Sequence, residues 1–237
     1  MTEHILKAFD SELEDLRRRI SEMGGIAESM LADSISSLVR KDTPLAQSVI
    51  TADARLDVLQ REVEEHAILM IARRQPLAVD LRETISAVRI SGDVERIGDL
   101  AKNISKRALA IAGQFQPQKV VAGLQHMSEL AMAQLKDVLD AYVQKNSKAA
   151  LDVWQRDGQI DSLNTSLFRE LLTYMMEDPR NISFCTHLLF VAKNVERIGD
   201  HTTNIAETVH YLASGETLTA ERPKNDRSSD AMAQENA

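Results

Sequence analysis

The chain has 237 residues, of which 43% are hydrophobic and only 4% aromatic, and its 28 basic and 36 acidic residues give a formal net charge of -8. This charge gives no support to a nucleic-acid partner, and the single cysteine, Cys185, excludes an internal disulfide and a thiolate metal cluster. Nine glycines and five prolines are few for this length, so turns should be rare and segments long. The composition therefore predicts an all-α protein.

Hydrophobic residues spaced by three and four predict a first long helix that starts near residue 6. The sequence KDTP at 41–44 ends it, because Asp42 or Thr43 can cap the next helix and Pro44 fits a first helical turn. The second helix should stop near Arg74, and Pro76 should open the third.

The third helix fades at residues 112–119, AGQFQPQK, which is the best candidate for a domain boundary. Ser147 is the expected cap of the fifth helix, and Asp178-Pro179 separates it from the sixth. The last three helices are expected at residues 120–143, at 147–176 and from 179 to about 215. The prediction is therefore six helices in two domains, residues 1–115 and 116–215, followed by a disordered polar tail at 216–237.

The N-terminal segment is polar and lacks the features of a signal peptide, and no eighteen apolar residues follow one another. We therefore expect a cytoplasmic, soluble protein that does not insert into a membrane.

An internal repeat supports the division into two halves. The sequence DVERIGDLAKNI at 93–104 recurs as NVERIGDHTTNI at 194–205 with eight of twelve residues identical, and ADARLD at 52–57 matches RDGQID at 156–161. On a helical wheel, Val94, Ile97 and Ile104 face the core, as do their counterparts Val195, Ile198 and Ile205.

The same repeat carries pairs of acidic residues spaced by four, which lie on one face of a helix. The four pairs are Asp53 with Asp57, Glu95 with Asp99, Asp157 with Asp161, and Glu196 with Asp200. The wheel separates these stripes from the apolar side, so the carboxylates are expected outside the core.

Two interpretations of these carboxylates stay open. In the first they form a solvated face whose charge is balanced by Arg96, Arg197 or other ion pairs. In the second they bind metal, with Asn103 or Asn204 adding a carbonyl oxygen, at two sites near the surface. Oxygen ligands of this kind suit iron, manganese, magnesium or, less specifically, zinc.

Gly98 and Gly199 each weaken a helix by roughly 0.8 to 1 kcal/mol relative to alanine, which a close helix crossing explains better than the approach of a ligand. His187 and His201 are expected to be packed or exposed rather than to bind metal. The motif Glu-x-x-His occurs once, at Glu207–His210, whereas di-iron bundles need it twice. A ferritin-like oxidase or metal-storage protein is therefore only the alternative, and no catalytic residue or organic cofactor is predicted.

Residues 74–104 and 188–207 resemble the two signature segments of the PhoU family, and the resemblance covers roughly residues 3 to 215. It implies two antiparallel three-helix bundles related by a pseudo-twofold axis. It also implies a non-enzymatic, homodimeric negative regulator of phosphate uptake and of the Pho regulon. Such a protein acts between PstB, the ATPase of the phosphate ABC transporter, and the sensor histidine kinase PhoR. Some family members bind multinuclear iron or other metals at motifs that fall on the four acidic pairs. A helical adaptor with neither metal nor a link to phosphate stays open from composition alone.

Overall fold

The computed structural model describes residues 2–114 and 118–222, and every regular element in that part of the chain is helical. Within these two ranges, seven α-helices and one short 3-10 helix follow one another. They are α1 (Thr2–Arg40), α2 (Thr43–Arg74), α3 (Val79–Ile111), α4 (Gln118–Val143), α5 (Ser147–Gln155), α6 (Asp157–Glu177), η1 (Pro179–Asn181) and α7 (Ile182–Ser214).

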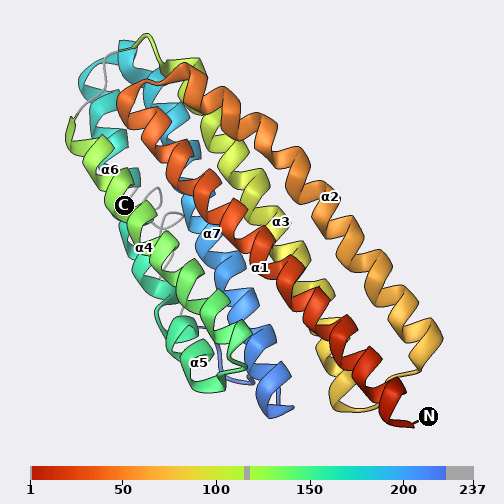
Figure 1. The fold of residues 1–237 in the computed structure, drawn as a ribbon. Coiled ribbons are helices and arrows are strands. Elements are labelled where there is room, and N and C mark those ends of the chain that lie inside the picture. The colour runs from red at the N-terminus through yellow and green to blue at the C-terminus, as the bar shows by residue number, and fades with distance from the viewer. Residues whose placement is uncertain (1, 115–117, 223–237) are drawn as a thin grey trace.

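The helices form two bundles that lie side by side (Figure 1). Helices α1, α2 and α3 make the first, while α4, α7 and the pair α5 and α6 make the second. Helix α3 packs against α7 and α1 packs against α4, so the halves meet along long helices. The predicted all-α class with two bundles is confirmed, and none of the described helices combines the length and apolarity that crossing a membrane requires.

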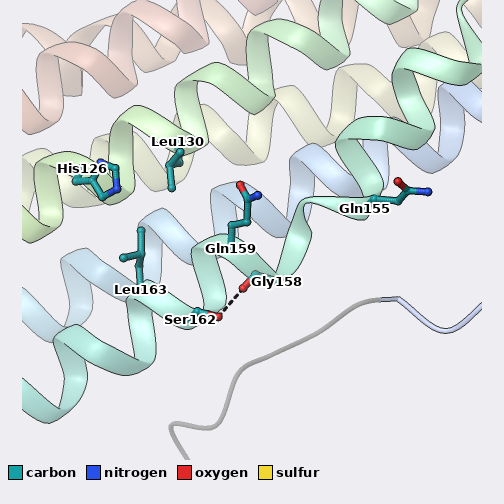
Figure 2. A pocket seen from close by; sticks show the side chains of 7 residues that line it. All are labelled: His126, Leu130, Gln155, Gly158, Gln159, Ser162 and Leu163. Atoms are coloured by element: carbon teal, nitrogen blue, oxygen red, sulfur yellow. Dashed lines mark hydrogen bonds between the residues drawn. The ribbon is translucent and has the colours of Figure 1, made fainter.

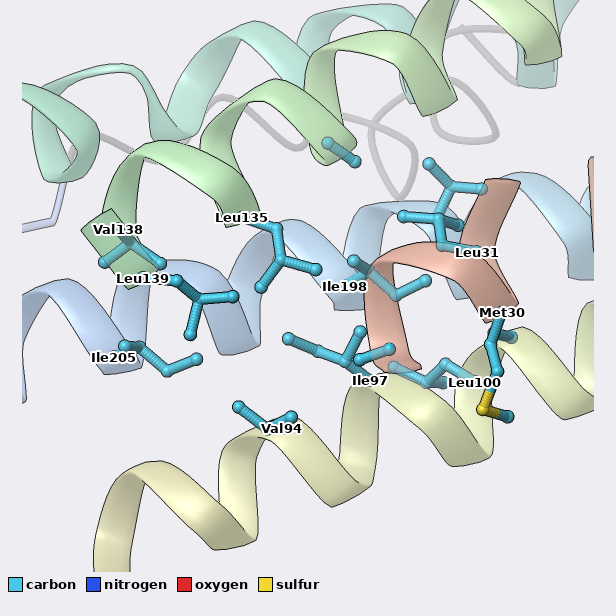
Figure 3. Close-up of a cluster of buried hydrophobic side chains, with 14 of the residues drawn as sticks. Met30, Leu31, Val94, Ile97, Leu100, Leu135, Val138, Leu139, Ile198 and Ile205 are labelled. Carbon is cyan, nitrogen blue, oxygen red and sulfur yellow. The ribbon is translucent and has the colours of Figure 1, made fainter. Parts of the chain in front are cut away.

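The buried apolar side chains form one core that runs through both halves. Figure 3 shows Val94 and Ile97 of α3 beside Leu135 of α4 and Ile198 of α7. All four side chains are fully buried, as the wheel predicts for the three that belong to the repeat, Val94, Ile97 and Ile198. Burial of such side chains contributes roughly 1.5 to 3 kcal/mol each, so the seam between the halves stabilises both.

The connection between α2 and α3 differs from the prediction. Asp42 caps α2 as expected, because its Oδ1 accepts a hydrogen bond of 2.9 Å from the backbone N–H of Leu45. However, α3 begins at Val79 and not at Pro76, since Gln75 (φ 49) and Ala78 (φ 47) both adopt positive φ. The left-handed Gln75 ends α2 by donating its N–H to the Ile71 carbonyl, and the helix can restart only after Ala78.

The predicted single helix at 147–176 is instead divided into α5 and α6 at Arg156, which has φ -88 and ψ 0. The carbonyl of Arg156 leaves the helical pattern and accepts a hydrogen bond of 3.2 Å from Gln134 Nε2 of α4. The cap of α5 is Asn146 and not Ser147, because Asn146 Oδ1 accepts from the Ala149 N–H at 3.1 Å. The Arg156 carbonyl also accepts from the Gln159 N–H at 3.1 Å, so a local bond and a bond from another helix both accompany a break that the periodicity of the segment does not reveal.

The two glycines of the repeat lie at close helix contacts, as predicted. A Cβ atom on Gly98 of α3 would overlap the Cδ1 atom of Leu56 on α2, and one on Gly199 of α7 would lie 2.8 Å from Ile160 Cδ1 of α6. Leu56 and Ile160 are equivalent positions of the repeat. In each bundle, the equivalent glycine therefore allows close contact between two helices, α2 with α3 in the first and α6 with α7 in the second.

Helix α7 ends at Gly215, whose φ of 81 gives it a left-handed cap. Residues 216–222 continue without regular secondary structure and bring Arg222 back onto α6 and α7. The rest of the predicted disordered tail, 223–237, lies outside the described residues.

Candidate functional site: two carboxylate clusters

In the first half, the acidic pairs of α2 and α3 come together in one cluster. Burial raises the pKa of Glu95, and the charges of Asp99, Asp57 and Asp53 raise it further. Lys102 Nζ donates hydrogen bonds to Asp53 Oδ2 and, at 2.5 Å, to Asp99 Oδ1. The ammonium group of Lys102 therefore bridges one carboxylate of each pair, Asp53 and Asp99, while Glu95 lies close enough to feel the charges of the other three.

Two basic side chains balance this first cluster. Burial disfavours the charge on Lys102, but its hydrogen bonds to Asp53 and Asp99 outweigh burial and raise the pKa, so the ammonium stays charged. Arg96 Nη1 lies 3.1 Å from Asp99 Oδ2, and its Nε lies 3.5 Å from Glu95 Oε2. In the structure, the carboxylates of the first cluster are therefore balanced by ion pairs, as the first of the two interpretations expects.

The second cluster joins α6 and α7 around Asp157, which is 3% exposed. Thr203 Oγ1 donates to Asp157 Oδ1 at 2.8 Å, and Arg222 Nε donates to Asp157 Oδ2 at 2.8 Å. Arg222 Nη2 also lies 3.4 Å from Asp200 Oδ1 and donates to the Asp200 carbonyl at 2.8 Å. Asn204 Oδ1 accepts from Arg222 Nη1 at 3.3 Å, so the guanidinium contacts three residues of the predicted set.

The two clusters take their cations from different places. In the repeat, Thr203 occupies the position of Lys102, and each reaches the first aspartate of the neighbouring helix. Threonine satisfies that aspartate with a hydrogen bond but brings no charge, and the charge comes instead from Arg222. Sequence reasoning missed Arg222, because it lies in a polar stretch without periodicity that gives no signal of where it docks.

Glu196 is the carboxylate of the second cluster that is least satisfied. Its Oε1 accepts from Lys193 Nζ at 2.8 Å, whereas its Oε2 is buried and accepts no hydrogen bond within the described residues. Burial raises the pKa of Glu196; Lys193 opposes this, while Asp200 and Asp161 add to it. This oxygen is the group in the cluster that most needs a positive partner.

The expectation that the carboxylates lie outside the core is wrong for half of them. Asp53, Asp157, Asp161 and Glu196 are buried. The other four are partly exposed. The wheel of one helix places a stripe beside the core but does not show that the neighbouring helix covers it. Here α2 packs on α3, and α6 packs on α7, along these stripes.

The oxygen donors fit a hard cation by their chemistry, although basic side chains take up part of their capacity: Lys102 and Arg96 in the first cluster, Arg222 and Lys193 in the second. Within residues 2–114 and 118–222, no three His, Cys, Asp or Glu side chains are arranged to hold a metal ion. Asn103, one of the two weaker predicted ligands, lines a separate groove between α3 and α7. Metal binding by the eight carboxylates therefore stays a prediction. The observation that favours it is Glu196 Oε2, a buried oxygen that accepts no hydrogen bond within the described residues.

The histidines make polar contacts between helices. His201 Nδ1 lies 2.8 Å from Asp93 Oδ1, and His210 Nδ1 lies 2.9 Å from Ser147 Oγ. Glu207 accepts from the Trp154 indole N–H at 3.0 Å. The single Glu-x-x-His motif thus ties α7 to α5, and these contacts lend no support to a ferritin-like di-metal centre.

A shallow hollow of about 510 Å³ between α4 and α6 lies apart from the carboxylates (Figure 2). His126 and Leu130 line it from α4, and the Ser162 hydroxyl donates to the Gly158 carbonyl at 2.8 Å on its other wall. No carboxylate lines this hollow.

Comparison with known proteins gives the same repeat and fold. A family model described as the PhoU domain matches residues 20–108 and 124–209, one segment in each half. The phosphate-specific transport system accessory protein PhoU homolog of Rhizobium meliloti (strain 1021) is 58% identical over 226 residues, 95% of either chain. The homolog of Caulobacter vibrioides (strain NA1000 / CB15N) is 52% identical and covers 95% of this chain and 98% of its own. The crystal structure of PhoU from Pseudomonas aeruginosa matches with a TM-score of 0.85 at 37% identity, over 88% of this chain and 100% of that one. A family model, close relatives and a solved structure thus agree, and the chain belongs to the PhoU family.

Proposed function

We propose that this protein is a regulatory accessory protein of phosphate transport, which restrains phosphate uptake and phosphate-starvation signalling without being an enzyme. The observation that carries the proposal is the identity of 58% over 95% of both chains to a relative named as an accessory protein of the phosphate-specific transport system. In this proposal it works in the cytoplasm as a homodimer. It links the ATPase of the phosphate ABC transporter (PstB) to the sensor histidine kinase (PhoR).

An exposed apolar surface supports a role in binding other proteins. Large hydrophobic side chains lie on both sides of the connection between α2 and α3 and are at least one third exposed. They are Ile68, Leu69, Leu77, Val79, Leu81 and Ile85. Leu77 is 80% exposed and Val79 53%. Exposed apolar residues grouped in this way are typical of interaction surfaces, so we assign this surface to the transporter ATPase.

The proposal is tested in a deletion strain complemented with variants. The deletion should express phosphate-starvation genes in rich phosphate, and the parent chain should restore repression. The double variant Leu77→Asp/Val79→Asp should fail to restore it and should lose the ATPase in pull-downs from phosphate-replete cells. Normal repression in the deletion strain itself would refute the regulatory role.

The matched control is Met176→Asp, because Met176 is 76% exposed in the other half of the molecule. This variant should bind the ATPase and repress like the parent. If it fails as completely as the double variant, the contact surface is not at the α2–α3 connection.

We further propose that the second cluster holds a divalent cation on Asp157, Asp161, Glu196 and Asp200, with iron, manganese, magnesium or zinc as the candidates, and that the first cluster does so more weakly. The ion would supply positive charge to Glu196 Oε2, which no hydrogen bond satisfies in the described residues. It would compete with Arg222 in the second cluster and with Lys102 in the first.

This metal proposal is tested on protein purified without a metal-affinity tag. Mass spectrometry of metals should find a metal that the Asp99→Ala/Asp200→Ala variant lacks. Removing the competitor with Arg222→Gln should tighten Mn²⁺ binding in a calorimetric titration. Equal metal content in the parent and the double variant would contradict the proposal.

A further inference from the structure

A polar groove separate from both carboxylate clusters lies between α3 and α7, and none of the described residues that line it is acidic. The groove has a volume of about 320 Å³, and its polar lining consists of Asn103, Lys106 and Arg107 from α3 with His187 and Asn194 from α7. Phe190 of α7 completes it. The described lining thus brings two cations and no acid, although the chain as a whole has a net charge of -8.

The repeat explains why the groove lacks an acid. Helices α3 and α7 run antiparallel at the centre of the molecule (Figure 1), and the opposite end of their contact carries an acid. There, Asp93 Oδ1 of α3 lies 2.8 Å from His201 Nδ1 and accepts from Asn204 Nδ2 at 3.3 Å, both on α7. The repeat places Asn194 at the position of Asp93 and Asn103 at that of Asn204. The groove is thus the symmetry-related site with its carboxylate replaced by an amide.

Arg107 is held in the groove by contacts with two α7 side chains and not by a counter-ion among the described residues. The guanidinium of Arg107 lies over the ring of Phe190, 4.3 Å from its centroid, and Nη1 lies 3.5 Å from His187 Nδ1. Neither Arg107 nor Lys106 forms an ion pair with another residue in the described part of the chain. Burial and Arg107 both lower the pKa of His187, so its ring stays neutral at pH 7 and adds no further charge.

A planar guanidinium fixed by stacking matches the geometry of phosphate oxygens, and a lysine beside it adds a second charge-assisted donor. The amide of Asn194 supplies a neutral donor at the position where the other site has its acid, and the amide of Asn103 supplies a second one at the position of Asn204. We propose that the groove binds a small oxyanion of the phosphate class, either inorganic phosphate or a phosphate monoester, through Lys106, Arg107 and the two asparagines. This inference does not depend on the proposed regulatory function, because it rests on the groove alone.

The decisive variant is Asn194→Asp, which places in the groove the carboxylate that the opposite site already has. The change is nearly isosteric and should leave the fold intact, while the new acid takes the place of the ligand. Arg107→Gln removes the stacked donor. Each should weaken anion binding roughly tenfold or more, as expected for loss or neutralisation of a charge-assisted contact. Lys148→Gln, which changes an exposed lysine on α5 outside the groove, is the matched control and should bind like the parent.

The measurement is isothermal titration calorimetry of the full chain with inorganic phosphate and, separately, with phosphoserine, at constant ionic strength. Thermal melts of each variant confirm that it is folded. Tighter binding of phosphate identifies the free anion as the ligand, and tighter binding of phosphoserine identifies a monoester. The proposal is overturned if neither compound binds at millimolar concentration, or if Asn194→Asp and Arg107→Gln both bind like the parent.

Discussion

At the scale of single residues, Glu196 combines burial with two nearby like charges and only one strong partner. A buried polar atom without a hydrogen bond costs roughly 1 to 3 kcal/mol, and Glu196 Oε2 is such an atom. Its pKa is raised above the usual 4.5 of a glutamate, so the folded chain holds this proton at pH values where the unfolded chain has lost it. The stability of the fold therefore falls as pH rises from 4.5 through the raised pKa.

We expect Glu196→Gln to stabilise the metal-free protein at pH 7 by about 1 kcal/mol, because it replaces an unsatisfied charge with a neutral amide. The gain should disappear near pH 4, where Glu196 is itself protonated. Denaturant unfolding at both pH values measures the difference, and Glu65→Gln on the exposed face of α2 should show no change at either. A variant that is less stable than the parent at pH 7 would show that the carboxylate is well satisfied.

Individual residues also mark where sequence-based prediction succeeds and fails. The repeat correctly placed Val94 and Ile97 in the core, because a buried face repeats every 3.6 residues whatever surrounds it. The repeat also identified Asp157 as a site residue. It did not predict that Asp157 is buried or that it bonds to Arg222, because both depend on which helix or segment packs over the acidic face of α6. Contacts between distant parts of the chain leave no periodic signal.

At the scale of helices, local sequence predicts where a helix begins or breaks only when the cause is local. The cap at Asp42 follows from local chemistry and is found where the sequence predicts it. The break at Arg156 is accompanied by a hydrogen bond from Gln134 of another helix, a contact that the local pattern of residues 147–176 does not encode. Glycines offer a direct test of how helices approach each other, since α3 contains two in different surroundings.

We expect Gly98→Ala to destabilise the protein by about 1 to 3 kcal/mol, because its Cβ would overlap the fully buried Leu56. Gly92→Ala in the same helix meets nothing within 4 Å and should stabilise by up to about 1 kcal/mol through helix propensity. Thermal melts of both variants, with equal helix content by circular dichroism, measure the two effects. Equal behaviour would show that Leu56 can move aside without cost.

At the scale of the whole molecule, the halves share one core although each contains a full copy of the repeat. Gly24 of α1 illustrates how closely they meet, since a Cβ there would lie 2.6 Å from Leu139 Cδ1 of α4. The side chains in Figure 3 come from α1, α3, α4 and α7, so separating the halves would expose them to water.

We therefore expect residues 1–114, expressed alone, to self-associate or aggregate rather than to form a stable monomer. Size-exclusion chromatography with light scattering measures this. The full chain cleaved at a protease site inserted after Gly113 should instead stay assembled, because the core holds the two pieces together. A monomeric fragment with a cooperative unfolding transition would show that the first bundle is independent.

The position of Arg222 gives the two clusters different thresholds for an incoming ion. Arg222 follows Gly215 on a short segment, and a ligand tethered in this way acts at an effective concentration of roughly millimolar. In the metal proposal, an ion that binds the second cluster must displace this tethered guanidinium, whose segment is also held by Leu218 packed against the core. Lys102 cannot be released in the same way, because it is part of α3 itself. Two copies of one acidic pattern are thus neutralised by a lysine within a helix in one half and, in the other, by an arginine that returns from beyond the end of the last helix.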